Sequence, residues 1–193
     1  MFAQAGHSTR AVFLDRDGVL TIPLFREGRS FAPLTLEDFH LYPDIAEPLK
    51  ELKRRGFLLV VVTNQPELGR GRLEPQTLVA MHRRLSAALP LDAIKICPHV
   101  PEDRCHCRKP LPGMLLEAAK EFEIDLAASY MVGDRAGDIA AGRAAGCRSI
   151  FVDLGYTAET PPRQPDAVVR SLQGAVDWIL RDVAGPCIWP MKG

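Results

Sequence analysis

The chain has 193 residues, the length of one domain that is large enough to bury a substantial apolar core without disulfides. Lysine plus arginine and aspartate plus glutamate both number 24, so the formal net charge is zero. A balanced charge gives no reason to expect nucleic acid or a membrane surface as a partner, and we therefore expect a small-molecule substrate.

Two further features bear on location. No apolar run in the sequence approaches about 20 residues, the length of a membrane span, and residues 1–10 lack the apolar core of a signal peptide. We therefore expect a cytoplasmic protein. A monomer is our default expectation.

Three of the five cysteines lie close together, which indicates a metal site more than a disulfide framework.

The chain divides into three predicted segments: a disordered lead-in over residues 1–10, one domain over residues 11–183, and a C-terminal tail over residues 184–193. Predicted strands and helices alternate within the domain. This alternation indicates a three-layer α/β fold with a doubly wound, mainly parallel sheet and helices on both faces. The predicted strands are 11–14, 57–62, 93–96, 129–132, 149–152 and 167–169, and the predicted helices are 45–55, 75–89, 112–122, 139–145 and 172–183.

The first predicted strand carries the most informative residues. Four apolar residues run directly into Asp15, Asp17 and Gly18. Ligands of parallel sheets bind at the carboxyl ends of the strands, so we expect the active site here. Carboxylates spaced i, i+2 point to one side, where they suit a divalent cation, or a nucleophile paired with an acid/base. A polar turn after a strand is the alternative interpretation.

Residues 21–41 contain a hairpin-like turn at 26–29. We expect this region to form a flap over the end of the first strand, because the sequence leaves no room for a separate cap domain. Asp44 is predicted to cap the helix 45–55, and Gly56 to end it.

Polar residues also follow the later strands. Thr63 and Asn64 follow the second strand, and Asp134 and Asp138 follow the strand 129–132. For Thr63 alone, a hydroxyl group that satisfies a strand end is the simpler interpretation. It gains functional meaning only as part of a set that also includes Arg108 and Lys109, which follow the cysteine-rich segment.

That cysteine-rich segment, residues 97–107, fits the pattern C-x-H-x5-C-x-C. Three thiolates and an imidazole suit a closed tetrahedral zinc site with no open position for catalysis. Zinc would stiffen the loop just before Arg108 and Lys109. His106 is a competing ligand that we expect to point outward, and free thiols are the alternative interpretation. The four predicted ligands are Cys97, His99, Cys105 and Cys107.

In this order, the strand-end residues resemble the four motifs of the haloacid dehalogenase-like phosphohydrolases. The matching stretches are Asp15-Arg16-Asp17-Gly18, Thr63-Asn64, Lys109 and Gly133-Asp134-Arg135-Ala136-Gly137-Asp138. The resemblance covers residues 11–153. It implies a Rossmann-like core and a Mg²⁺-dependent phosphomonoesterase that works through an aspartyl-phosphate.

The resemblance also implies a role for each residue. Asp15 would be the covalent nucleophile, and Asp17 would protonate the leaving alcohol and then activate water. Mg²⁺ would be held by Asp15, the backbone carbonyl of Asp17 and Asp134, because a hard cation prefers oxygen ligands. Lys109 would add positive charge near the phosphate, and Thr63 would hold phosphoryl oxygens.

Asp138 is expected to orient Lys109 or a metal-bound water rather than to bind the metal directly. Asn64, Arg108 and Arg135 are the candidate substrate-binding residues. For the two arginines the reason is that a planar guanidinium suits a phosphate or a sugar. Arg70 is a further candidate, although a loop arginine is often simply solvated.

The cysteine-rich segment narrows the resemblance within the superfamily. Together with the Arg-Lys-Pro that follows it, this segment is similar to the D-glycero-D-manno-heptose 1,7-bisphosphate phosphatases and their histidinol-phosphate phosphatase relatives, which are compact and capless. The resemblance implies removal of the 7-phosphate from a heptose 1,7-bisphosphate. Histidinol phosphate is the rival substrate, and it would require an acidic patch from residues such as Glu27, Asp38 or Glu67.

A different kind of function is also possible from the sequence: a zinc-stabilised scaffold that binds phosphate but has no catalytic activity. Against it, Asp15, Asp17, Lys109 and Asp134 are all present. A silent relative would have little physical reason to retain buried like charges, which cost stability.

Overall fold

The structure is a computed structural model that describes residues 8–185, and the parts of the predicted lead-in and tail at residues 1–7 and 186–193 lie outside the described residues. The strands are β1 (Arg10–Leu14), β2 (Leu24–Arg26), β3 (Arg29–Phe31), β4 (Phe57–Asn64), β5 (Ala93–Cys97), β6 (Tyr130–Gly133), β7 (Arg148–Val152) and β8 (Ala167–Val169). The α-helices are α1 (Ala46–Arg54), α2 (Pro66–Gly69), α3 (Pro75–Ala88), α4 (Gly113–Phe122), α5 (Ala136–Ala145) and α6 (Leu172–Ala184). None of the helices within residues 8–185 is both long and apolar enough to cross a membrane.

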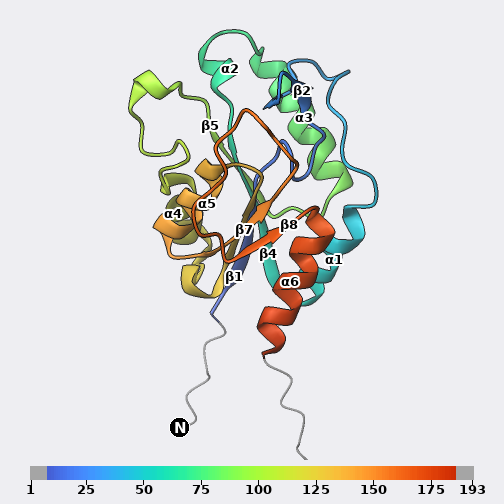
Figure 1. Cartoon of the computed structure of the whole chain (residues 1–193), viewed down its shortest axis with the longest axis vertical. Helices are drawn as coiled ribbons and strands as arrows, with labels where there is room; N and C mark the ends of the chain where they lie inside the picture. The colour runs from blue at the N-terminus through green and yellow to red at the C-terminus, as the bar shows by residue number, and fades with distance from the viewer. Residues whose placement is uncertain (1–7, 186–193) are drawn as a thin grey trace, which may run out of the picture.

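Six strands form one sheet in the order β5-β4-β1-β6-β7-β8, and each neighbouring pair is parallel (Figure 1). The predicted doubly wound parallel sheet is therefore confirmed. The chain first builds outward from β1 to β4 and β5, and then crosses to β6 on the other side of β1. This reversal places a topological switch point between the carboxyl ends of β1 and β6, where α/β sheets bind ligands.

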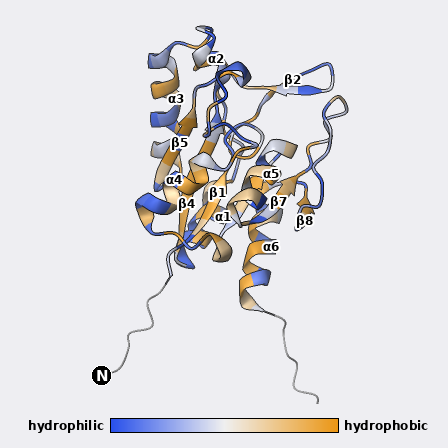
Figure 2. Cartoon of the chain, turned by 90° about the vertical axis from the view of Figure 1, so that its left-hand side faces the viewer, coloured by the Kyte–Doolittle hydropathy of each residue, from blue (hydrophilic) through white to orange (hydrophobic). Residues whose placement is uncertain are grey.

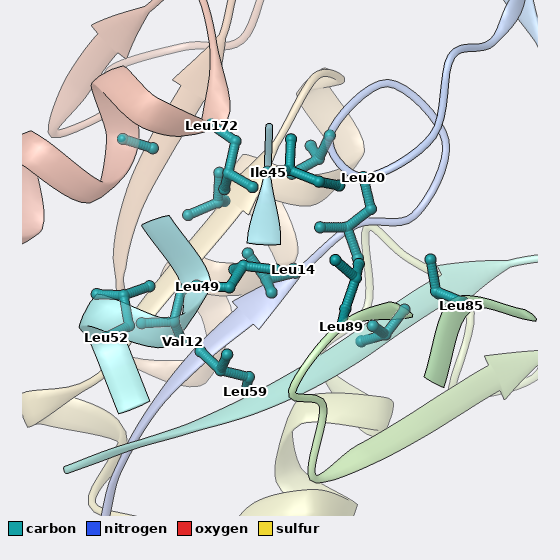
Figure 3. Close-up of a cluster of buried hydrophobic side chains, with 14 of the residues drawn as sticks. Val12, Leu14, Leu20, Ile45, Leu49, Leu52, Leu59, Leu85, Leu89 and Leu172 are labelled. Atoms are coloured by element: carbon teal, nitrogen blue, oxygen red, sulfur yellow. The ribbon is translucent and has the colours of Figure 1, made fainter. Parts of the chain in front are cut away.

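Alternate residues of the central strands enter two separate cores. Val12 and Leu14 of β1 pack with Leu49 and Leu52 of α1, as Figure 3 shows, and α3 and α6 contribute to the same face. Phe13 faces the opposite side, where α4 and α5 cover the sheet. Hydrophobic residues accordingly follow the central strands in Figure 2, as expected for a sheet that is buried on both faces.

The short antiparallel pair β2 and β3 forms a hairpin outside the main sheet. Its residues line the same cavity as Asp15, so the expected flap over the end of the first strand is confirmed. No larger insertion interrupts the described part of the chain, in agreement with the prediction of a fold without a cap domain.

Three local predictions were wrong. Asp44 does not cap α1: it has a φ of +58°, and the residue at the N-cap position is Ile45, which makes no side-chain cap. Helix α5 begins at Ala136, three residues before the predicted start, so Asp138 lies in its first turn. Thr9, expected in the disordered lead-in, forms a bridge to Ile124.

Helix α5 packs so closely on the sheet that Gly142 has no space for a side chain. A Cβ at this position would lie 2.5 Å from the Cβ of Met131 and 2.5 Å from the Oγ of Ser149. We expect Gly142→Ala to lower the free energy of unfolding by about 1–3 kcal/mol, because the helix must move away from β6 and β7. Denaturant unfolding measures this change.

Gly137 provides the matched control in the same helix. The nearest atom to a Cβ at Gly137 is 3.8 Å away, in ordinary contact distance. Gly137→Ala is expected to leave stability unchanged or to raise it by up to about 1 kcal/mol through helix propensity. Equal losses in the two variants would contradict the packing explanation.

Candidate active site

The loop after β1 passes unusually close to the end of β6. The backbone N–H of Asp15 donates to the carbonyl oxygen of Val132 at 2.9 Å. Gly18 has a φ of +102°, and a Cβ there would lie 2.1 Å from Oδ2 of Asp134. Only glycine permits this turn, which brings Asp15 and Asp134 to the two sides of the switch point.

Lys109 supplies the positive charge at the centre of the site. Its Nζ lies 2.6 Å from Oδ1 of Asp15, 2.6 Å from Oδ1 of Asp138 and 2.7 Å from the carbonyl oxygen of Val62. Burial disfavours the ammonium form, but the carboxylates of Asp138 and Asp15 outweigh it and raise the pKa of Lys109. Lys109 therefore stays charged, and Asp138 lies where it can orient this side chain.

Negative charge nevertheless exceeds positive charge here. Carboxyl oxygens of Asp15, Asp134 and Asp138 all lie within 4.8 Å of one another. Burial raises the pKa of Asp134, and the charges of Asp15 and Asp138 raise it further. Oδ1 of Asp134 is buried and accepts no hydrogen bond from the described residues. An orphaned carboxylate oxygen beside a second carboxylate fits a divalent cation such as Mg²⁺.

Asp138 is a poorer ligand for such a cation, because both of its oxygens are already engaged. Oδ1 pairs with Lys109, and Oδ2 accepts from the backbone N–H of Arg135 at 3.0 Å. The second contact closes the first turn of α5, which explains why that helix begins at Ala136.

The carboxylate of Asp17 is held apart from this cluster. It accepts hydrogen bonds from Nη2 of Arg16 at 2.8 Å, Oγ1 of Thr21 at 2.9 Å and Nε2 of Gln65 at 3.0 Å. Arg16 is fully buried, and its Nη1 lies 3.2 Å from Nε2 of His82. Burial, aided by the charge of Arg16, lowers the pKa of His82 to about 4, so the imidazole is neutral and can accept this bond.

The two polar residues at the end of β4 differ in what they contact. Oγ1 of Thr63 accepts from Nε2 of Gln65 at 2.9 Å and faces the cavity, with its own proton available to a ligand. The side-chain amide of Asn64 instead forms two hydrogen bonds with the backbone of Lys109. It donates to the carbonyl oxygen at 3.0 Å and accepts from the N–H at 3.1 Å. Asn64 also lines the cavity, so its predicted role in substrate binding stays a prediction beside its contacts with Lys109.

The four predicted zinc ligands meet at one point. Sγ of Cys97 lies 3.2 Å from Sγ of Cys107 and 3.6 Å from Sγ of Cys105, and Nδ1 of His99 lies 3.2 Å from Sγ of Cys107. Tetrahedral Zn²⁺ with bonds of about 2.3 Å separates its sulfur ligands by about 3.8 Å, so the cluster fits zinc with a small expansion. His106 is exposed and stands outside the cluster, as predicted.

A cavity of about 1100 Å³ opens above Asp15, Asp17 and Lys109. Guanidinium groups dominate its charged walls, and they come from four separate segments of the chain. A cavity of this kind suits an anionic substrate with several oxygen atoms. The arginines that line it are Arg26, Arg29, Arg70, Arg72, Arg108 and Arg135.

All three arginines predicted for substrate binding line the cavity, and each of them already contacts another part of the protein. Arg70 forms an ion pair with Glu67, and Nη1 of Arg108 donates to the carbonyl oxygen of His99 at 3.3 Å. Nη2 of Arg135 donates to the carbonyl oxygen of Ser30 at 2.7 Å and thereby ties the flap to α5.

Sequence reasoning missed several residues of the site. Arg16 stands between two predicted site residues, and Gln65 follows two others, so their positions carried a signal. Arg26, Arg29 and Tyr156 carried none, because the hairpin and the loop after β7 reach the site only through the tertiary fold. Their contributions depend on chain segments that pass over the end of the sheet.

Comparisons with known proteins agree with this geometry. Residues 106–175 match the HAD-hydrolase-like family. Over 189 residues the chain is 35% identical to the D-glycero-beta-D-manno-heptose-1,7-bisphosphate 7-phosphatase of Yersinia pestis, with 92% of this chain and 93% of that protein covered. The enzyme of the same name from Haemophilus ducreyi is 37% identical over 185 residues, with coverage of 88% and 98%.

A solved structure is similar as well. The D,D-heptose 1,7-bisphosphate phosphatase from B. bronchiseptica, complexed with magnesium and phosphate, superposes with a TM-score of 0.76 at 31% sequence identity. The match covers 90% of this chain and 99% of that one. With relatives above 30% identity along nearly its whole length, and with the four motifs assembled at one sheet edge, the chain belongs to the haloacid dehalogenase-like hydrolases, among the phosphatases of that family.

Proposed function

We propose that the chain removes the 7-phosphate from D-glycero-β-D-manno-heptose 1,7-bisphosphate. The observation that carries this proposal is the division of the cavity. The base of the cavity holds Asp15 beside Lys109, and the walls above this base carry six arginines. A carboxyl oxygen of Asp134 lies within 4.8 Å of one of Asp15. The base suits the phosphate that reacts, and the arginines suit a second phosphate and the hydroxyl groups of a sugar. The names of the similar enzymes supply the heptose.

The proposed reaction has two steps on Asp15. Oδ2 of Asp15 attacks phosphorus, the bond from phosphorus to the sugar oxygen breaks, and Asp17 gives a proton to that leaving oxygen. Asp17 then takes a proton from water, which attacks the aspartyl-phosphate and releases inorganic phosphate. The contacts of Asp17 with Arg16, Thr21 and Gln65 fix the carboxyl group in the lining of the cavity, next to Asp15, for both transfers.

Asp15, the backbone carbonyl of Asp17 and Oδ1 of Asp134 would hold Mg²⁺. When bound, Mg²⁺ would neutralise negative charge on the carboxylates and on the phosphate. Lys109 adds a fixed positive charge next to the attacking carboxylate, and Thr63 offers its hydroxyl to the phosphoryl oxygens.

The cavity favours a bisphosphate over histidinol phosphate. Asp38 and Glu67 do line it, whereas Glu27 is absent from its lining. Glu67, however, is already paired with Arg70 and with Arg72, the latter at 3.4 Å. Of the other acidic residues in the walls, Glu159 lies 3.8 Å from Nη2 of Arg135, and Asp38 accepts a hydrogen bond from Oγ1 of Thr35 at 2.7 Å. Among the described residues, Asp38 is thus the one wall carboxylate without an ion-pair partner, which is less than an acidic patch for a cationic amine.

We propose a structural role for zinc at Cys97, His99, Cys105 and Cys107. The metal would fix residues 97–107, which leave β5 and lead directly to Arg108 and Lys109. The domain limits 11–183, the monomeric state and the cytoplasmic location stay predictions.

Replacing the nucleophile tests the first step. We expect Asp15→Asn to lower kcat by at least about a thousandfold, or about 4 kcal/mol of transition-state stabilisation, since an amide cannot attack phosphorus. The fold should persist, because Lys109 keeps Asp138 as a partner. Phosphate release measures the loss. Asp177→Asn, which removes an exposed carboxylate on α6, should keep wild-type activity and so controls for the loss of a carboxylate as such. Activity near wild type in Asp15→Asn would refute the assignment.

A substrate panel tests the specificity. The panel contains both anomers of heptose 1,7-bisphosphate, fructose 1,6-bisphosphate, histidinol phosphate and an aryl phosphate, each with Mg²⁺. We expect kcat/KM for the β-heptose anomer to exceed the others by about 100-fold, equivalent to about 2.7 kcal/mol of transition-state binding. Equal rates across the panel would keep the phosphatase but reject the heptose. A complete lack of turnover would favour the silent scaffold.

Removing one zinc ligand tests the role of the cluster. We expect Cys107→Ser to lose bound zinc and to reduce kcat/KM by about 10- to 100-fold, because Arg108 and Lys109 lose their support. Metal analysis and steady-state kinetics measure the two effects. The exposed neighbour His106 gives the control: His106→Ala should retain zinc and activity. Zinc loss without a kinetic change would show that zinc does not position Arg108.

A further inference from the structure

The loop that follows β7 brings an aromatic hydroxyl group to the candidate metal site. The hydroxyl of Tyr156 donates a hydrogen bond to Oδ2 of Asp134 at 2.7 Å. Among the described residues, this is the one hydrogen bond that the Asp134 side chain accepts, and its Oδ1 stays without a partner. The two oxygens of Asp134 are therefore not equivalent: one is held by the protein and the other is left open.

This division matters for how a carboxylate binds a cation. A free carboxylate can rotate and can offer one or both oxygens, whereas Mg²⁺ requires ligands in a near-ideal octahedron. A hydrogen bond to Oδ2 fixes the plane of the carboxyl group and aims Oδ1 at the site. Groups that hold a metal ligand in this way typically change metal affinity when they are removed.

Tyr156 is itself held in place by the flap. Its ring stacks on Phe25 of β2, with ring centroids 5.9 Å apart and an interplanar angle of 23°. Two further contacts join the same loop to the hairpin: the N–H of Ala158 donates to the carbonyl oxygen of Gly28 at 3.1 Å, and Glu159 accepts from the N–H of Ser30 at 3.2 Å. The hairpin that covers the cavity thus also supports the hydroxyl group on Asp134.

We propose that Tyr156 is a positioning residue that orients Asp134 for binding Mg²⁺ through Oδ1 alone, and that Phe25 of the flap holds Tyr156 in place. This inference rests on the proposed magnesium site. It gives the hairpin a second role: besides lining the cavity, it links the position of the flap to the affinity for the cation.

Tyr156→Phe removes the hydroxyl group and keeps the ring. Tyr130→Phe is the matched control, because Tyr130 donates a similar bond to Oδ2 of Asp182 at 2.5 Å, but from the opposite end of β6. The Mg²⁺ dissociation constant is measured without substrate, from the rise in unfolding temperature with Mg²⁺ concentration. The Mg²⁺ dependence of phosphate release gives an independent value.

We expect Tyr156→Phe to raise the Mg²⁺ dissociation constant by about 10- to 100-fold, with substrate KM at saturating Mg²⁺ close to wild type. Tyr130→Phe should bind Mg²⁺ like the wild type. Phe25→Ala, which keeps the hydroxyl group, should weaken Mg²⁺ binding in the same direction but by less than Tyr156→Phe.

An unchanged Mg²⁺ affinity in Tyr156→Phe would overturn the role of the hydroxyl group. An unchanged affinity in Phe25→Ala would overturn the support by the flap. If the wild type itself showed no Mg²⁺-dependent stabilisation and no Mg²⁺-dependent activity, the proposed magnesium site would fail first, and the inference would fail with it.

Discussion

The candidate active site is organised around an excess of negative charge at the carboxyl ends of the strands. Three buried carboxylates, Asp15, Asp134 and Asp138, face a single buried ammonium group on Lys109. Burial and mutual repulsion raise the pKa values of Asp15 and Asp134, which shows that the fold holds these charges at a cost. A bound cation would reduce this repulsion, so binding of the proposed Mg²⁺ would stabilise the folded state.

Lys109 is the one member of this charge cluster that neither follows a strand directly nor lies in a helix. Asp15 and Asp134 follow strands directly, whereas Lys109 stands in an irregular segment between β5 and α4. Two features outside the strands hold this segment in place. The side-chain amide of Asn64 forms two hydrogen bonds with the Lys109 backbone, and the four-residue Cys/His cluster brings together the two ends of the preceding loop, residues 97–107. In the proposed function, a metal in this cluster would affect the chemistry through the placement of the Lys109 charge, although the cluster lies outside the reacting centre.

Features that depend on neighbouring residues in the sequence could be predicted. The apolar run before Asp15 predicted a strand, and the ligand spacing of residues 97–107 predicted a cluster that the structure assembles. Features that depend on tertiary contacts could not. Asp44 is a common capping residue type, yet the chain takes a left-handed turn there, and the start of α5 depends on the carboxylate of Asp138 reaching the N–H of Arg135. Tyr156 reaches Asp134 only because the loop after β7 folds back against the flap.

The carboxylates proposed for the reaction and the arginines proposed to bind the rest of the substrate differ in the same way: the former follow strands of the main sheet, and the latter lie outside it. The proposed nucleophile and the candidate metal ligand follow adjacent parallel strands, whose register pairs Leu14 with Val132 and so fixes Asp15 relative to Asp134. The arginines lie on the flap, after α2, beside the zinc cluster and at the start of α5. These segments all lie outside the six-stranded sheet. In the proposed function, the arginines of these segments would select the substrate and Asp15 would attack the phosphate, so the residues for specificity and for chemistry would lie on different parts of the fold.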